Sequence, residues 1–440
     1  MKKLILILVA VLPGFAHDGL AQVGKICNWD NGRKAAVVLT FDDWTPGQYP
    51  VVVPELRNRN INATFNIILN DVAAWNHDWP TVVTTASDGN EIANHTLDHP
   101  SLDTVPSSKL HTEIRDVKTT IDIHITSQKV LTFAYPLGVG AGNTAKEKEI
   151  RDSIKACGHI AARSVNPSSF NYTYNFAPTD DDYYKILTYA MNGSVSTSTF
   201  YGQIQNIKNG GGLLTYLYHS VDTHTGTYGD NWYARVIQDS LQKQLDTLVS
   251  QKNVVWITTF AQAIKYHKEK NCAALSQIQA PDGSTWIVNL TDTLSNNAIY
   301  NQPLSLKLKM NGVNYNLITQ NGNNLAIDSI YSDTIMFRAV PDAGQITLTA
   351  NATGLSSALS DQDIRINPVP SSGLIYISTE NLLKDAEIVL FDAMGKEVYS
   401  MPDYNGSKNF LVDLSTQTPG VYFLKIRQGN ALIIKKIILI

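Results

Sequence analysis

Two adjacent carboxylates and a pair of histidines are the residues of this chain best suited to chemistry. Asp42 and Asp43 close an apolar run that begins at Ala35, and His95 and His99 follow a second apolar segment. One carboxylate and two imidazoles are enough to ligate a divalent metal ion, and the other carboxylate is then free to accept a proton. The four residues therefore predict a hydrolytic metal site.

The two aspartates have different tasks in such a site. A carboxylate that ligates a metal is neutralised by it, whereas an unligated neighbour can take a proton from a water molecule made acidic by the metal. We assign Asp43 as the ligand beside His95 and His99, and Asp42 as the base, although residue types alone leave the opposite order open. These ligands suit zinc, cobalt, nickel or iron, and the residue types alone do not choose among them. A turn that merely begins with two aspartates is the competing interpretation.

Two further residues could complete the chemistry. His219 ends the apolar run that starts at Leu213, where it could protonate a leaving group. The tight turn from Phe133 to Gly138 could direct a backbone N–H, that of Tyr135, toward the oxyanion of a tetrahedral intermediate. For His219 the alternative is a histidine packed among tyrosines.

The segments around these residues alternate between strand and helix patterns from about residue 33 to 270. Helices are expected at Ser107–Ile125, Ala145–Cys157 and Trp232–Gln251. This alternation predicts a parallel sheet with helical crossovers, in a barrel or near-barrel, and places the candidate residues at the carboxyl ends of strands, where ligands bind. The expected strands are Ala36–Phe41, Ala63–Ile68, Glu91–Asn94, Val130–Ala134, His159–Arg163, Leu213–Tyr218 and Val254–Thr258.

The pattern changes to short alternating strands after about residue 275. Leu304, Leu306 and Leu308 alternate with polar residues, which predicts a small β-sandwich over residues 276–355. A polar stretch, Gly354–Gln362, precedes a third all-β module over residues 361–440. We therefore expect an α/β catalytic domain over residues 22–275, followed by two small all-β domains.

Composition and the amino terminus limit the compartment and the partners. The chain has 440 residues, 43% hydrophobic and 17% charged, with a net charge of −4, so it is globular and has no basic stripe for nucleic acid. Residues 1–21 read as a secretory signal peptide, and no later segment is long and apolar enough to span a membrane. The chain has three cysteines. A disulfide between Cys27 and Cys272 is possible and would leave Cys157 unpaired, but the sequence does not decide the pairing.

The ordered motifs resemble a known family. Thr40-Phe41-Asp42-Asp43, His95-Thr96-x-x-His99, the aromatic–Pro turn at Tyr135-Pro136 and the strand ending in His219 are similar to the polysaccharide deacetylases of carbohydrate esterase family four. The resemblance covers about residues 33–270. It implies a distorted (β/α)₇ barrel, a divalent metal that is usually zinc, and hydrolysis of acetyl groups on sugars. It also implies the roles given above: Asp42 as base, Asp43, His95 and His99 as ligands, Tyr135 as oxyanion donor and His219 as acid.

The third motif departs from the family pattern. Many members have an arginine there that orients the catalytic base, and this chain has Ala134. Our hypothesis is that Arg163, at the end of the next expected strand, supplies the guanidinium instead. A surface or structural ion pair is the alternative for Arg163.

The last module resembles the C-terminal sorting domains of type IX secretion cargo. The resemblance rests on Asn367-Pro368-Val369-Pro370, the segment from Phe391 to Val398, and Gly420-Val421-Tyr422-Phe423. It implies handling by the type IX secretion machinery, passage across the outer membrane, and a secreted or cell-surface location.

The sequence thus leads to a ranked set of functions. The first is a secreted, metal-dependent deacetylase of an acetylated carbohydrate, with N-acetylglucosamine-type glycans favoured. The second is an O-acetylxylan esterase or a related small-molecule amide hydrolase. The third is a catalytically inactive surface protein that binds glycans, to which the changed third motif gives some weight.

Overall fold

The computed structural model divides the chain into two compact units, Met1–Thr349 and Ala350–Ile440. The expected signal peptide, residues 1–21, and the polar stretch Gly354–Gln362 lie outside the described residues. The expected boundary between residues 275 and 276 falls inside the first unit, at the start of a strand, and remains a prediction. The structure describes residues 24–72, 78–165, 171–228, 233–279, 285–310, 312–350, 364–379, 383, 386–404, 408–428 and 431–440.

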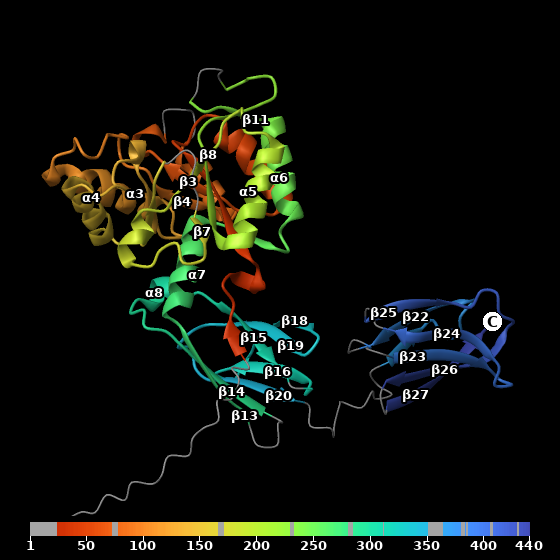
Figure 1. Cartoon of the computed structure of the whole chain (residues 1–440). Helices are drawn as coiled ribbons and strands as arrows, with labels where there is room; N and C mark the ends of the chain where they lie inside the picture. The colour runs from red at the N-terminus through yellow and green to blue at the C-terminus, as the bar shows by residue number, and fades with distance from the viewer. Residues whose placement is uncertain are drawn as a thin grey trace, which may run out of the picture. The chain divides into compact units, whose positions relative to one another are not determined.

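A nine-stranded, mainly parallel sheet forms the centre of the first unit and confirms the α/β class (Figure 1). Its order is β6-β5-β4-β3-β2-β9-β7, with β12 also pairing with β2 and β8 with β9. All seven expected strands are present, and the additional strands are β7 and β8. The bounds are β2 (Ala35–Asp42), β3 (Thr64–Ile67), β4 (Glu91–Asn94), β5 (Thr132–Ala134), β6 (Ala161–Arg163), β7 (Asn171–Thr173), β8 (Tyr189–Ala190), β9 (Gly211–Tyr218) and β12 (Val255–Thr258).

Strand β2 explains why the candidate aspartates lie at a buried edge. All eight residues of β2 are buried, as expected of a central parallel strand covered on both faces. Its two neighbours hold it in register, with Phe41 opposite Tyr218 of β9 and Asp42 opposite Asn66 of β3. Asp42 therefore ends the strand inside the protein.

The sheet is curled, and an irregular segment connects its distant strands β6 and β9. Ile186 bridges to Arg163 of β6, and Tyr189 then pairs with Tyr216 of β9. Two backbone hydrogen bonds, Ser164 N–H to Ile186 O and Met191 N–H to Leu217 O, continue both contacts. The carboxyl ends of β2 and β6 consequently face each other across the curled sheet.

Helices surround the sheet (Figure 1). The expected helix Ala145–Cys157 is confirmed over Ala145–Ala156. Thr144 and Glu147 form a capping box that stabilises its start. The expected helix Ser107–Ile125 consists of three shorter helical segments, and the third expected helix begins only at Gln238. The bounds are α1 (Val53–Arg59), α2 (Trp79–Ser87), α3 (Val117–His124), α4 (Ala145–Ala156), α5 (Thr197–Gly210), α6 (Gln238–Ser250) and α7 (Phe260–Cys272), with β10 (Val221–Asp222) and β11 (Val236–Ile237) before α6.

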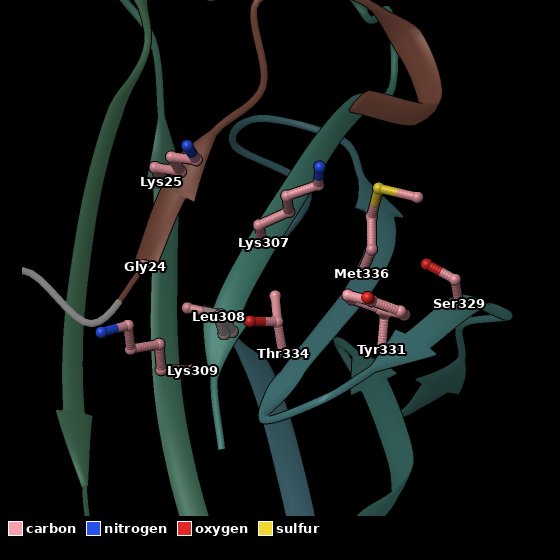
Figure 2. A pocket seen from close by; sticks show the side chains of 9 residues that line it. All are labelled: Gly24, Lys25, Lys307, Leu308, Lys309, Ser329, Tyr331, Thr334 and Met336. Atoms are coloured by element: carbon pink, nitrogen blue, oxygen red, sulfur yellow. The ribbon is translucent and has the colours of Figure 1, made fainter. Parts of the chain in front are cut away.

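The rest of the first unit contains two antiparallel sheets, ordered β1-β15-β19-β18 and β13-β14-β20-β16-β17. Strand β1 comes from the amino-terminal end of the described chain and lies beside β15 (Figures 1 and 2). The region expected to start at residue 276 therefore includes a strand from the start of the chain. The bounds are β1 (Gly24–Ile26), β13 (Ala274–Gln279), β14 (Thr285–Thr291), α8 (Asn297–Tyr300), β15 (Leu304–Lys309), β16 (Tyr315–Gln320), β17 (Asn323–Asn324), β18 (Ile327–Tyr331), β19 (Thr334–Ala339) and β20 (Ile346–Ala350).

Buried aromatic and polar contacts join these sheets to the α/β part. Trp29 is fully buried and donates its indole N–H to the carbonyl of Gly211 at 2.7 Å. The hydroxyl of Tyr266, on α7, donates to the carbonyl of Cys27 at 3.1 Å and accepts the N–H of Ser305 at 3.2 Å. The two parts of the first unit thus share one interior. All three cysteines are free, so Cys27 and Cys272 are not paired.

The second unit is all-β within its described residues. It has two sheets, ordered β21-β22-β25 and β24-β23-β26-β27, over a core that includes Ile377, Leu390 and Leu424. Across the described part of the chain, no helix has the length and apolar character needed to cross a membrane. The bounds are β21 (Ile364–Asn367), β22 (Leu374–Thr379), β23 (Ala386–Asp392), β24 (Glu397–Tyr404), β25 (Asn409–Asp413), β26 (Gly420–Gln428) and β27 (Ala431–Leu439).

Glu269 on α7 makes the stability of the first unit dependent on pH. It is fully buried, and neither carboxylate oxygen has a hydrogen-bond donor among the described residues. Burial, followed by the negative charges of Asp292 and Asp342, raises the pKa of Glu269 from 4.5 to about 8. The carboxyl group of Glu269 loses its proton near pH 4.5 in the unfolded chain but keeps it up to about pH 8 in the folded protein. Glu269 therefore destabilises the folded state increasingly as the pH rises from about 4.5 to about 8.

We therefore predict that Glu269→Gln raises the thermal unfolding midpoint relative to wild type above about pH 8, by an amount equivalent to a few kcal/mol. At about pH 5 the two midpoints should be close. Glu149→Gln, on the exposed side of α4, is the control and should show no such pH dependence. A constant difference between Glu269→Gln and wild type from about pH 5 to about pH 8.5 would contradict this interpretation.

Candidate metal centre

Asp43, His95 and His99 converge at the carboxyl ends of β2 and β4. The Oδ1 atom of Asp43 lies 3.3 Å from Nε2 of His95 and 3.9 Å from Nε2 of His99. One potential ligand atom from each residue lies within 4.8 Å of the other two. The structure thus brings together the three residues predicted as ligands.

Unusual backbone conformations direct these side chains. Asp43, Thr96 and His99 have φ angles of 72°, 71° and 57°, in the left-handed region that non-glycine residues rarely adopt. Side chains stabilise the turn that carries the histidines: Asn94 Oδ1 accepts the N–H of Thr96, and Thr96 Oγ1 accepts the N–H of His99. Such strain persists only where surrounding contacts hold it, and it is concentrated at functional sites.

His95 is held in one orientation. Its Nδ1 lies 2.9 Å from the carbonyl oxygen of Ala134, at the end of β5. Because a carbonyl can only accept, Nδ1 carries the proton in this contact, and Nε2 presents its lone pair toward Asp43 when the ring is neutral. This is the arrangement in which a histidine ligates a metal through Nε2.

The donor set fits a divalent cation. Asp43 Oδ1 is buried without a hydrogen-bond partner in the described part of the chain, which is rare for a carboxylate oxygen. Burial raises the pKa of Asp43, but the close approach of His95 and the electrostatic influence of His95, His219 and His99 outweigh burial and lower the pKa to about 2. A carboxylate that stays ionised beside two imidazoles is the ligand chemistry that zinc and similar metals take.

Asp42 is held by two donors on one oxygen. The guanidinium of Arg163 forms an ion pair with Asp42 Oδ1, and Asn66 Nδ2 donates to the same atom at 2.9 Å. Both Asp42 and Arg163 are fully buried. The other oxygen, Oδ2, has no hydrogen-bond donor among the described residues and lies 3.7 Å from Nε2 of His95. One oxygen is thus fixed, and the other faces the candidate metal ligands.

His219 lies on the same side of the sheet, directly after β9. The charges of Asp42 and Asp43 act on it, but burial outweighs them and lowers its pKa. Its ring is 4.9 Å from that of Tyr233, in an edge-on arrangement. Gln48 fixes the backbone here, since its Nε2 donates to the carbonyl of Asp42 at 2.5 Å and to that of His219 at 3.0 Å.

Tyr135 does not present the free N–H that its motif suggested. Its backbone N–H donates to the carbonyl of Arg163 at 3.2 Å, because the pairing of β5 with β6 continues one residue beyond the strands. Its hydroxyl donates to the carbonyl of Tyr184 at 2.9 Å. In this structure both donors of Tyr135 are therefore engaged inside the protein, and the oxyanion role of its N–H stays a prediction.

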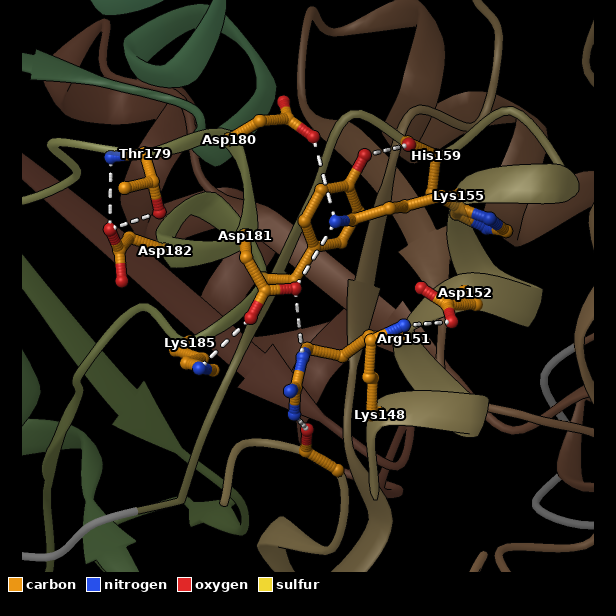
Figure 3. Close-up of polar contacts among 12 residues, drawn as sticks. Lys148, Arg151, Asp152, Lys155, His159, Thr179, Asp180, Asp181, Asp182 and Lys185 are labelled. Carbon is orange, nitrogen blue, oxygen red and sulfur yellow. Dashed lines mark hydrogen bonds and ion pairs between the residues drawn. The ribbon is translucent and has the colours of Figure 1, made fainter. Parts of the chain in front are cut away.

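A polar network supports the loop after Tyr135 (Figure 3). Arg151 Nη1 donates to the carbonyls of Gly140 and Gly142, each at 2.7 Å, while its Nε donates to Asp181 at 3.1 Å. Lys155 and Lys185 also form ion pairs with Asp181, at 3.1 and 2.9 Å. Buried and half-buried charges thus pin this loop to the segment after β7.

Sequence reasoning missed Asn66 and Gln48. Asn66 lies in the predicted strand β3, directly opposite Asp42, so a register between the first two strands would have revealed it. Gln48 lies in a helical turn between β2 and α1, and no sequence pattern distinguishes it.

Two family models match the chain. Residues 30–159 match the model for polysaccharide deacetylases, and residues 365–440 match that for a secretion system C-terminal sorting domain. Residues 30–159 are thus similar to the domain of polysaccharide deacetylases. The sorting domain indicates secretion or attachment at the cell surface, which confirms the recognition of both modules from their motifs.

Solved structures of similar proteins were also found. A Streptococcus pyogenes deacetylase, PplD, in complex with acetate, is 25% identical over 30% of this chain and 56% of its own, with a TM-score of 0.27. A Streptomyces lividans family 4 carbohydrate esterase in complex with acetate is 16% identical over 51% of this chain and 91% of its own, with a TM-score of 0.33. A Bacillus anthracis protein described as a family 4 pseudoenzyme is 15% identical over 52% of this chain and 65% of its own, also with a TM-score of 0.33.

The three converging side chains lead to a direct prediction for the deacetylase domain. Wild-type protein incubated with zinc and dialysed should retain about one ion per chain, and Asp43→Asn or His99→Ala should retain much less, because each removes one of three ligands. His111→Ala, an exposed histidine on a helix of the same unit, is the matched control and should retain as much zinc as wild type. Elemental analysis measures the content. Unchanged zinc in Asp43→Asn would exclude the predicted ligand set.

Proposed function

We propose that the deacetylase domain is a metal-dependent hydrolase that removes acetyl groups from an acetylated carbohydrate. The observation that carries the proposal is the state of Asp42: one oxygen is fixed by Arg163 and Asn66, and the other is unpaired beside three ligand atoms. That arrangement suits a base that accepts a proton from water. N-acetylglucosamine-type glycans are the favoured substrates.

In the proposed mechanism Asp43, His95 and His99 would hold a divalent metal, with zinc preferred and cobalt, nickel or iron also suitable. When bound, the metal lowers the pKa of water and polarises the acetyl carbonyl. Asp42 Oδ2 would accept the proton of the water molecule that attacks the carbonyl carbon. His219 then donates a proton to the departing sugar nitrogen or oxygen, so that acetate and the free sugar group leave.

Arg163 acts as a positioning residue in this mechanism. It occupies Oδ1 of Asp42, so the proton is accepted at Oδ2, on the side of the candidate metal ligands. This supports the hypothesis that Arg163 replaces the guanidinium expected at Ala134. The oxyanion role of Tyr135 remains part of the proposal and requires its N–H to leave the backbone carbonyl of Arg163.

For the whole chain, we propose an α/β barrel-like catalytic domain over residues 22–275, a β-sandwich over residues 276–355, and a sorting domain over residues 361–440. We further propose that a signal peptide over residues 1–21 directs export, and that type IX machinery recognises the last module. The match over residues 365–440 supports the second step.

Acetate release tests the proposed function. Zinc-loaded wild type should release acetate from chitooligosaccharide faster than from acetylxylan, and Asp42→Asn should lower kcat by about 10²–10⁴-fold while keeping its bound zinc. Asn66→Ala, which removes only a neutral donor to the same carboxylate, should cause a smaller loss. Acetate released only from acetylxylan would favour the esterase alternative. No release from any glycan by the metal-loaded protein would favour the inactive binding protein.

The positioning role of Arg163 gives a separate prediction. Arg163→Ala should lower kcat by about tenfold or more, and destabilise the fold by about 3–5 kcal/mol because it leaves Asp42 as an unpaired buried charge. Guanidinium added at millimolar concentration should restore part of kcat in the folded fraction. Arg57→Ala, which breaks an exposed ion pair with Asp88, is the control and should affect neither property greatly. Full activity in Arg163→Ala would contradict the role.

A further inference from the structure

One face of the sheet β1-β15-β19-β18 carries three lysines in adjacent rows (Figure 2). Lys25 of β1 lies directly opposite Lys307 of β15, and Lys309 lies two residues further along the same strand. Because side chains alternate between the faces of a strand, all three belong to one face. The opposite face of β15 presents Leu306 and Leu308, which are buried.

Aromatic and apolar side chains complete this face. Lys307 is opposite Met336 of β19, and Lys309 is opposite Thr334, which is in turn opposite Tyr331 of β18. Met336 is buried, whereas Tyr331 is 83% exposed. We call Lys25, Lys307, Lys309, Thr334, Met336 and Tyr331 the lysine face.

No ion pair joins any of the three lysines to a carboxylate in the described ranges. Three aspartates on adjoining segments are engaged with other groups: Asp30 pairs with Arg33 at 3.2 Å and Asp328 with Arg338 at 2.9 Å, while Asp333 accepts the N–H of Gly312 at 2.8 Å. Like charges directly opposite each other destabilise an antiparallel pair, so the Lys25–Lys307 pairing costs stability as it stands.

The lysine face is also hollowed. It lines a pocket of about 600 Å³, together with Gly24, Leu308 and Ser329 (Figure 2). That volume is within the range of ligand pockets in proteins. A hollow with three cationic groups and one exposed aromatic ring can bind an anionic ligand that also has an apolar face. The ammonium groups attract the negative charge of the ligand, and the aromatic ring packs against its apolar face.

We propose that the lysine face binds an acidic polysaccharide, with the carboxylates of uronic acid units on the lysines and a sugar ring on Tyr331. The inference rests on the proposed function in one respect, since a glycan is the polymer that the deacetylase domain is proposed to meet. Both sites belong to the same compact unit, so one chain can hold an acidic polymer while it acts on an acetylated sugar.

Binding to polygalacturonate tests the proposal on the full mature chain, by calorimetry and by migration in gels that contain the polymer. Wild type should bind, and its affinity should fall steeply as salt rises. Lys307→Gln combined with Lys309→Gln should weaken binding by about tenfold or more, which corresponds to about 1.4 kcal/mol. Tyr331→Ala should weaken it several-fold, and Tyr331→Phe should bind as wild type.

The matched control is Lys109→Gln combined with Lys243→Gln, which removes the same charge from exposed positions near the deacetylase domain and should leave binding unchanged. Equal weakening by the control would overturn the proposal, as would absence of binding or equally tight binding of neutral xylan. Tighter binding of anionic lipid vesicles or of single-stranded DNA would also overturn it.

Failure here can be told apart from failure of the proposed function. Acetate release from a short, neutral chitooligosaccharide depends on the candidate metal centre and should be the same in the Lys307→Gln, Lys309→Gln variant as in wild type. Conversely, Asp42→Asn should bind polygalacturonate normally while releasing acetate about 10²–10⁴-fold more slowly than wild type. A lysine variant that loses both properties would overturn the assignment of a separate binding face.

Discussion

The buried ion pair between Asp42 and Arg163 is the interaction on which the candidate site depends. Both side chains are shielded from water, and they project from the ends of β2 and β6, which the curled sheet brings face to face. Removing one partner leaves an uncompensated buried charge, which costs about 3–5 kcal/mol. The pair therefore selects one geometry of the sheet and, in the same contact, decides which oxygen of Asp42 is free to accept a proton.

The end of strand β5 couples this ion pair to the candidate metal ligands. The carbonyl of Ala134 orients His95, and the next residue, Tyr135, donates its N–H to the backbone carbonyl of Arg163. Hydrogen bonds to the end of β5 thus hold both a proposed ligand and the backbone of the residue whose guanidinium contacts the proposed base. The guanidinium of Arg163 thus contacts Asp42, a contact that the family pattern would place on the side chain at position 134.

Much of this arrangement could be predicted from the sequence, for identifiable reasons. Apolar runs such as Ala35–Leu39 end at polar residues, and parallel strands bring such ends to one edge, so the convergence of Asp42, Asp43, His95 and His99 was predictable. The hydrogen bond from the Tyr135 N–H to the carbonyl of Arg163 could not be predicted, because it depends on how far the pairing of β5 with β6 extends. Strand β1 joins a sheet made of residues some 280 positions later, and only tertiary packing shows that.

The central claim is that Asp43, His95 and His99 hold a metal while Asp42, fixed by Arg163, stays outside its coordination shell. Anomalous diffraction at the zinc edge, from crystals of the zinc-loaded protein, measures this most directly. The account predicts one peak about 2.0–2.2 Å from Asp43, His95 Nε2 and His99 Nε2, with Asp42 Oδ1 still on Arg163 and Oδ2 unligated. A peak coordinated by Asp42 in place of Asp43, or no peak among these residues, would contradict it.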